Sequence, residues 1–134
     1  MPTTKAEEVA IQSSADVVIV RQAVRSAAME QSFSLVDQTK LVTAASELAR
    51  NTLDYGGGGN VRIELLVEGI RKGVKLIFKD QGPGIADIEL AMRDGYTSGG
   101  GLGLGLGGAK RLVSEFHIDS APGKGTTITI TRWR

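Results

Sequence analysis

Glu47 and Asn51 are the first residues along the chain whose types and spacing could do chemistry. They lie four positions apart in a helical pattern, so their side chains share one face of that helix. A carboxylate there can orient or deprotonate a hydroxyl, and a carboxamide oxygen suits a hard cation such as Mg²⁺. A Glu and an Asn at this spacing usually lie on a solvated helix surface. The pair therefore indicates a functional site only in combination with the motifs that follow it.

A glycine-rich run at residues 99–108 is the most conspicuous of these motifs. It reads GGGLGLGLGG and leads directly into the helical pattern AKRLVSEF. Glycine lets the backbone approach a ligand without an intervening Cβ. A helix that begins just afterwards offers unpaired N–H groups that suit an anion such as phosphate. A flexible linker is the alternative interpretation of this run, but flexible linkers are rich in glycine and serine and do not require the alternating leucines.

Two shorter motifs contain glycine and polar residues. DQGPG at residues 80–84 follows a strand pattern, and GKGT stands at residues 123–126. Each alone indicates a turn. Residues 103–108 also match the G-x-G-x-x-G fingerprint of dinucleotide sites, but that motif must follow a buried strand and here the polar segment 94–98 precedes it.

Composition narrows the class of protein. The chain has 134 residues, which is the size of one domain, and a net charge of +1 without a basic run, which argues against a nucleic-acid partner. It contains no cysteine and no apolar run long enough to cross a bilayer, and its N-terminus lacks a signal-peptide core. We therefore expect a cytoplasmic protein that binds neither nucleic acid nor membrane.

Periodicity predicts an α+β fold. Helices are expected over 16–31, from a capping signal at Ser34 to the glycines at 56–59, over 85–93, and from the glycine run to about Phe116. The side chains expected to face the core are Val17, Val20, Val24 and Ala27 in the first helix, and Leu41, Ala45, Leu48, Thr52 and Tyr55 in the second. Strands are expected over 9–11, 60–68, 73–79, 116–120 and 126–133, with a turn over 68–73 between the second and third and a turn over 122–125 between the last two. This order predicts a two-layer sandwich, in which a mixed but mostly antiparallel sheet is covered on one face by three helices.

The four motifs, in this order, resemble the boxes of the GHKL ATPase/kinase superfamily, which includes gyrase B, Hsp90, histidine kinases and MutL. Residues 47–51 (ELARN) resemble its N box, 80–85 (DQGPGI) its G1 box, 101–106 (GLGLGL) its G2 box, and 123–126 (GKGT) its final Gly-Thr element. The resemblance covers nearly the whole chain. It implies a single domain over residues 1–134 with the Bergerat ATP-binding fold.

Within the superfamily, the chain resembles the small bacterial anti-sigma-factor and switch-kinase branch, and most of all the serine/threonine kinases of the stressosome. The segments that carry this include VDQ at 36–38, SELARN at 46–51, DG at 94–95 and TRW at 131–133, together with residues 68–75, 80–85, 98–102 and 110–112. The resemblance implies an ATP- and Mg²⁺-dependent kinase that phosphorylates STAS-domain partners and, once released, activates a PP2C-type phosphatase. An anti-sigma factor that sequesters a sigma factor and phosphorylates a STAS protein is the alternative.

The resemblance also implies roles for the matching residues. Glu47 would act as the base for the attacking hydroxyl, Asn51 would hold Mg²⁺, and Asp80 would accept the adenine amino group. The residues expected to pass close to the nucleotide or wrap its phosphates are Gly82, Gly84, Gly101, Leu102, Gly103, Leu104 and Gly105.

Thr126 is expected to reach the adenine side, with Thr127 the less favoured choice. Arg93, Lys110 and Arg111 are candidates for γ-phosphate or partner contacts, although a charged residue at a helix end is usually just solvated. His117, the one histidine, falls at a helix-to-strand junction and is expected to be structural.

Overall fold

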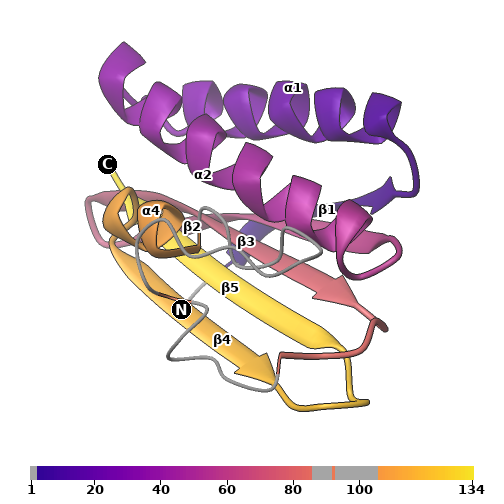
Figure 1. Ribbon diagram of the computed structural model, residues 1–134. Helices are drawn as coiled ribbons and strands as arrows, with labels where there is room; N and C mark the ends of the chain where they lie inside the picture. Colours follow the sequence, from indigo (N-terminus) through magenta and orange to yellow (C-terminus); the bar gives the residue numbers. More distant parts are fainter. Residues whose placement is uncertain (1–2, 86–91, 93–105) are drawn as a thin grey trace.

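The computed structural model describes residues 3–85, 92 and 106–134 (Figure 1). Its elements are β1 (Thr3–Ile11), α1 (Ser14–Glu30), α2 (Leu35–Asp54), β2 (Gly59–Glu68), β3 (Arg71–Asp80), α4 (Leu106–Arg111), β4 (Glu115–Ser120) and β5 (Thr126–Trp133). Among these residues, no helix combines the length and the apolar character needed to cross a membrane.

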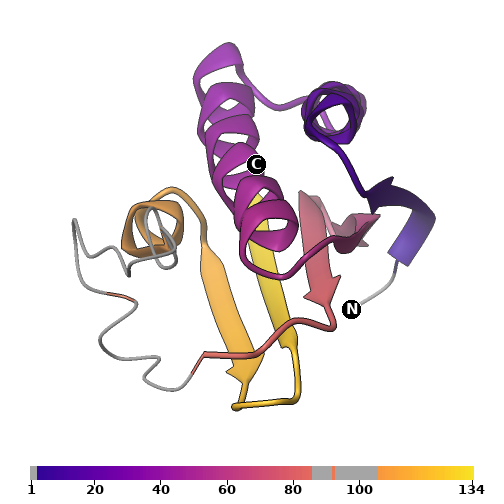
Figure 2. The ribbon, with the colours of Figure 1, turned by 45° about the vertical axis from the view of Figure 1, so that its right-hand side comes forward.

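The five strands form one sheet in the order β1-β2-β3-β5-β4, and α1 and α2 lie side by side over one of its faces (Figures 1 and 2). This arrangement confirms the predicted two-layer α+β fold. Every strand pair of the described sheet is antiparallel, so the expected mixture of directions is not found. β2 and β3 also extend further than predicted and leave a two-residue turn, in which Gly69 adopts a φ of 63°.

Both long helices begin at a serine cap. The Ser13 hydroxyl accepts a hydrogen bond from the Asp16 N–H, and the Ser34 hydroxyl accepts one from the Asp37 N–H at 3.1 Å, which confirms the predicted capping signal at Ser34. The side chains predicted to face the core are buried except for the half-buried Tyr55: Val17, Val20, Val24, Ala27, Leu41, Ala45, Leu48 and Thr52.

The third helix is much shorter than predicted. α4 ends at Arg111, whereas the pattern predicted a helix to about Phe116. Gly107 and Gly108 lower the helix propensity of this segment. Beyond Arg111 the chain instead pairs with β5. The Ser114 N–H donates to the Thr131 carbonyl at 2.8 Å, and the Ser114 hydroxyl accepts from the Trp133 N–H at 3.1 Å, so the chain enters β4 at Glu115.

Two other predictions need comment. β1 begins at Thr3 rather than Val9, because its pairing with β2 is made by the backbone and its first side chains are exposed and show no alternation. The helix predicted over 85–93 lies outside the described residues except for Ile85, a buried non-helical residue, and Met92.

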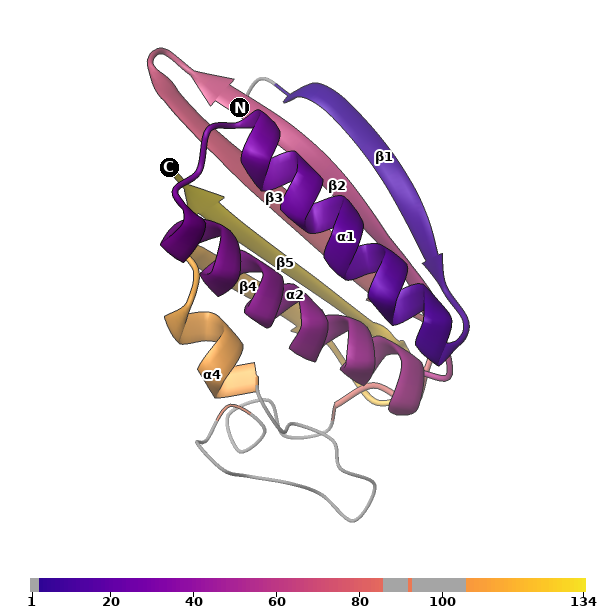
Figure 3. The same cartoon turned by 90° about the horizontal axis from the view of Figure 1, so that it is seen from above.

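The C-terminal end of α2, the end of β3 and the start of β5 come together at one end of the molecule (Figure 3). Asp80, the last residue of β3, is the register partner of Thr126, the first residue of β5. The fold therefore brings the N-box helix and the residues of two other motifs to one place.

Candidate nucleotide-binding site

A pocket opens where these three elements meet. It encloses ≈ 310 Å³ including its open mouth. Its lining is Leu48, Asn51, Thr52, Tyr55, Phe78, Asp80, Ile85, Leu106, Thr126 and Ile128. Most of these side chains are apolar, and a few polar groups converge among them, which is the usual composition of a site for a flat heterocyclic ligand.

Among the described residues that line the pocket, Asp80 carries the charge, and its exposed fraction is only 9%. Its Oδ1 accepts a hydrogen bond from the Gly82 N–H at 2.8 Å. Burial raises the pKa of the Asp80 carboxyl, and hydrogen bonds from the backbone N–H groups of Gly82 and Thr126 offset part of that rise. A ligand that donates further hydrogen bonds to this carboxylate would relieve part of the cost of burying it.

Two glycines fix the position of the Asp80 carboxylate. A Cβ added to Gly56, just beyond α2, would lie 2.4 Å from the Asp80 Cγ, and one added to Gly82 would lie 2.7 Å from the Gly56 Cα. Neither distance is compatible with normal van der Waals contact. The end of α2, the end of β3 and the loop after β3 therefore touch with no space for a methyl group.

Three contacts hold the loop after Asp80. The Tyr55 hydroxyl donates to the Gly84 carbonyl at 2.7 Å, and the Gly123 N–H donates to the Pro83 carbonyl at 2.7 Å. Gly84 has a φ of 78°, and a Cβ there would lie 2.0 Å from the Ala121 carbonyl oxygen. A glycine is thus required at position 84 by both conformation and space.

A pair of hydroxyl groups orients Thr126. The Ser120 Oγ accepts from the Ile85 N–H at 2.8 Å, donates to the Gly125 carbonyl at 3.0 Å and lies 2.8 Å from the Thr126 Oγ1. A serine hydroxyl has one proton. If the Ser120 proton goes to the Gly125 carbonyl, the Thr126 hydroxyl must donate its own proton to Ser120. The Thr126 oxygen is then left with lone pairs only, so toward the pocket it acts as a hydrogen-bond acceptor. This is the arrangement that uses all three contacts.

The N-box helix supplies the polar group on the opposite wall. Asn51 is half-buried and lines the pocket, while Glu47 lies one turn earlier and is exposed. Their spacing puts both on the same side of α2. Among the described residues, no cluster of three or more His, Cys, Asp and Glu side chains could hold a metal by itself.

The structure brings together five of the predicted site residues, namely Asn51, Asp80, Gly82, Gly84 and Thr126, with Glu47 one turn from the pocket. Gly101, Leu102, Gly103, Leu104, Gly105 and Arg93 lie outside the described residues.

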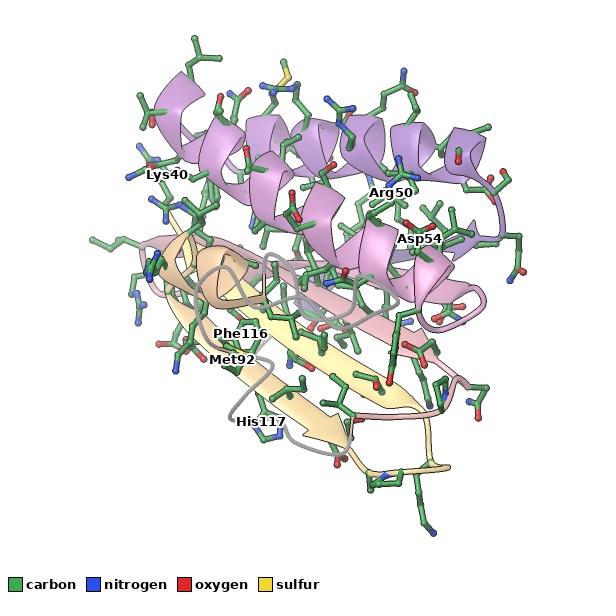
Figure 4. All side chains as sticks on the ribbon, viewed as in Figure 1. Lys40, Arg50, Asp54, Met92, Phe116 and His117 are labelled. Atoms are coloured by element: carbon green, nitrogen blue, oxygen red, sulfur yellow. The ribbon has the colours of Figure 1, made fainter. Side chains whose placement is uncertain are left out.

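The remaining candidates lie away from the described pocket lining. Thr127 alternates with Thr126 along β5 and points to the other face of the sheet. Lys110 and Arg111 are exposed in the last turn of α4. His117 is exposed on β4, whereas its neighbour Phe116 packs against the core (Figure 4).

Sequence reasoning missed three residues that shape the site. Tyr55 was assigned to the buried stripe, Gly56 to the end of a helix and Ser120 to an ordinary strand. The one available signal was the position of Tyr55 and Gly56 directly after the N-box helix, since a glycine there can allow close approach of another element.

Comparison with known proteins agrees with this geometry. Residues 36–133 match the family described as histidine kinase-, DNA gyrase B- and HSP90-like ATPase. The chain is 48% identical over 118 residues to the serine/threonine-protein kinase RsbT of Bacillus subtilis, a match that covers 88% of this chain and 89% of RsbT. It is 34% identical over 101 residues to the anti-sigma F factor of Bacillus licheniformis, covering 70% and 68% of the two chains.

A solved structure shares the fold. The RsbU and RsbW domains of a Mycobacterium tuberculosis protein superpose with a TM-score of 0.64 at 22% identity, covering 98% of this chain and 33% of that one. The family itself is shown by the match over residues 36–133 and by the 48% identity to RsbT. The chain belongs to the histidine kinase-, DNA gyrase B- and HSP90-like ATPase family, on the branch that holds serine/threonine kinases of the RsbT kind.

Proposed function

We propose that residues 1–134 form one kinase domain that transfers the γ-phosphate of ATP, with Mg²⁺, to a serine or threonine of a STAS-domain partner in a stressosome-type switch. Once released, the kinase activates a PP2C-type phosphatase. The observation that carries the proposal is the buried Asp80 carboxylate, held beside Asn51 and Thr126 at the end of the N-box helix.

The pocket is suited to adenine. Asp80 presents a carboxylate, and Thr126 presents lone pairs when it donates to Ser120. Two acceptors match the exocyclic amino group of adenine, which has two N–H donors. Guanine carries a carbonyl oxygen at that position, and a carbonyl facing a carboxylate is repulsive.

The two N-box side chains divide the remaining work. The Asn51 amide oxygen is a suitable ligand for Mg²⁺, which usually takes one or two protein ligands and completes its shell with phosphate oxygens and water. Glu47, exposed one turn before Asn51 on α2, is assigned the proton of the attacking hydroxyl. As the new bond from that oxygen to the γ-phosphorus forms, the bond to the β-phosphate oxygen breaks and ADP leaves.

Thermal unfolding with nucleotides tests the base assignment. ATP with Mg²⁺ should raise the melting temperature, because saturation at a hundred times the Kd stabilises the folded state by about 2.7 kcal/mol. GTP should raise it much less. Equal shifts with the two nucleotides would remove Asp80 from its role.

Kinase assays with two variants test the division of labour. Glu47→Ala should bind ATP normally and lose ~10²–10⁴-fold in phosphotransfer, the usual effect of a lost general base. Asn51→Ala should weaken Mg²⁺-dependent nucleotide binding itself. Glu8→Ala, which removes an exposed carboxylate from β1, is the matched control and should change neither. Normal phosphotransfer by Glu47→Ala would refute the assignment.

Affinity for the STAS partner tests the switch. Phosphorylation adds about −1.5 to −2 charges beside Glu47 and the nucleotide phosphates, so repulsion should expel the product. A Ser→Asp mimic of the phosphorylated partner should therefore bind more weakly than the unmodified partner. Equal affinities would leave a kinase without a switch.

The 34% identity to an anti-sigma F factor favours one second candidate, a kinase that also sequesters a sigma factor. Binding of purified sigma factors to the ATP-loaded chain distinguishes the two functions, because a dedicated switch kinase should bind none of them.

A further inference from the structure

The two outer faces of the molecule differ in character. In the described part of the chain, five of the six exposed large apolar side chains lie on α1 and α2; they are Val18, Ile19, Met29, Leu35 and Val36. The open face of the sheet carries instead residues such as Lys75, Thr129 and Glu115. Val18 and Ile19 lie near the start of α1, whereas Met29, Leu35 and Val36 lie near its end and at the start of α2. The helical face is therefore the one to examine for a partner.

A groove runs along that face between the two helices. It is lined by Val18, Arg21, Gln22, Arg25 and Val42 and encloses ≈ 510 Å³ including its open mouth. Figure 3 shows α1 and α2 side by side, with no other described element across their outer side. The groove thus combines two valines with two arginines and a neutral amide.

The groove carries positive charge that the described residues do not compensate. Arg21 and Arg25 are one helical turn apart. Arg25 Nη1 donates to the neutral Gln38 Oε1 at 3.2 Å, and Arg21 has no ion pair or side-chain hydrogen bond with any described residue. Of the residues that the structure describes, none that lines the groove is a carboxylate.

The nearby carboxylates of the same helices are occupied elsewhere. Glu30 pairs with Lys5 of β1 at 3.4 Å, and Asp37 pairs with Arg132 of β5 at 2.7 Å. At the other end of the helix pair, Arg50 of α2 donates to the Ser14 hydroxyl at the start of α1 at 3.4 Å. Arginine therefore recurs along the line between the helices.

The groove is separate from the nucleotide pocket. Val42 lines the groove and Asn51 lines the pocket, and both belong to α2. Nine residues at 3.6 per turn rotate a side chain by about 180° from its starting direction, so the two residues lie on opposite sides of the helix. A protein seated in the groove does not need to reach the γ-phosphate, so the groove suits a partner that is not the substrate.

We propose that the α1–α2 groove binds an acidic amphipathic helix of the PP2C-type effector. The identity of this partner rests on the function proposed above. A helix can place an apolar side chain against Val18, which is 48% exposed above the buried Val42, while carboxylates on its flanks reach Arg21 and Arg25. The part of α1 that lines the groove runs from Val18 to Arg25, which is about two helical turns, or roughly 12 Å, of contact.

The test measures two partners against one set of variants. Arg21→Glu/Arg25→Glu reverses the charge of the groove, and Val18→Asp, at a residue already 48% exposed, disrupts its apolar part without disturbing the core. Both should weaken binding of the purified phosphatase at least tenfold, while the rate of STAS phosphorylation and the ATP-induced rise in melting temperature stay at the wild-type level.

The matched control, Lys75→Glu/Lys79→Glu, makes the same charge change on the open face of the sheet and should leave phosphatase binding unchanged. Phosphatase binding that survives both groove variants, or that is absent from the wild-type chain, overturns the groove assignment. A groove variant that loses STAS phosphorylation but still binds the phosphatase overturns the groove assignment as well. Failure of the wild-type chain to phosphorylate any STAS protein would instead refute the kinase function, which the same assays read separately.

Discussion

Gly56→Ala is expected to separate nucleotide binding from folding. Gly56 does not have a positive φ, so an alanine fits its backbone, and the effect comes from one contact. The new Cβ would lie 2.4 Å from the Asp80 Cγ and 2.6 Å from both its Cβ and Oδ2. Carbon atoms in contact normally stay about 3.5–4.0 Å apart, so the Asp80 side chain has to move by roughly 1 Å.

That displacement removes Asp80 from the position in which Gly82 holds it. A hydrogen bond to a charged group contributes ~1.5–3 kcal/mol, so loss of the adenine contact should raise the Kd for ATP by about 10- to 150-fold. Overpacking of a tight contact costs ~1–3 kcal/mol of unfolding free energy. Titration calorimetry with ATP and urea unfolding measure the two effects separately.

Gly69→Ala is the matched control. Gly69 has a φ of 63° and open space around its Cβ position, in the hairpin turn at the far end of β3. Alanine there should cost ~1–2 kcal/mol through its left-handed backbone, with no change in ATP affinity. If Gly56→Ala binds ATP as tightly as the wild type, the close packing around Asp80 does not position the carboxylate for the base.

Three further substitutions have defined outcomes. Tyr55→Phe removes the 2.7 Å hydrogen bond to the Gly84 carbonyl and should lower the unfolding free energy by ~1 kcal/mol in urea titrations and weaken ATP binding several-fold. Ser32, just after α1, has a φ of 63°, which is unfavourable for a residue other than glycine. Ser32→Gly should therefore raise the unfolding free energy by ~1 kcal/mol and with it the melting temperature. Because folding raises the pKa of Asp80 above its ordinary value of 3.8, its contribution to stability is full below that pH and is lost as the pH rises through the folded-state pKa. Asp80→Asn should therefore unfold at a higher urea concentration than the wild type at pH 7, and this difference should shrink as the pH is lowered. The variant should also lose ATP binding. An equal difference in urea midpoint at every pH would contradict this explanation.

Local signals were sufficient for most of the fold. The serine cap at Ser34, the spacing of buried residues in α1 and α2, and the turns around Gly69 and at 122–125 are properties of short segments, and each was predicted correctly. The end of α4 was not, because it is decided by residues distant in sequence. Ser114 bonds to Thr131 and Trp133 of β5, and no periodicity in residues 106–116 could show that pairing.

The residues of the candidate site fall into the same two groups, those that local sequence indicates and those that only tertiary contacts reveal. Asp80, Asn51 and Thr126 could be named from motifs because their chemistry is visible in residue type. Tyr55, Gly56 and Ser120 could not, because each acts by touching an element far along the chain, namely Gly84, Asp80 and Thr126. A tyrosine at the end of a helix, a glycine after it and a serine in a strand have ordinary local explanations, and only the tertiary contacts give them a role at the site.

The close packing of Gly56 and Gly82 against Asp80 limits how this kinase can be re-engineered for chemical genetics. A common way to make a nucleotide-binding enzyme accept a bulkier ATP analogue is to truncate a side chain beside the base. At Gly56 and Gly82 nothing remains to be truncated. Apolar residues of the pocket lining such as Phe78 and Ile128 are 2% and 5% exposed and belong to the core, so truncating them to make room for a bulkier base removes core packing. Such truncations cost ~2–5 kcal/mol, so an analogue-sensitive form of this chain will need a stabilised background before it can be made.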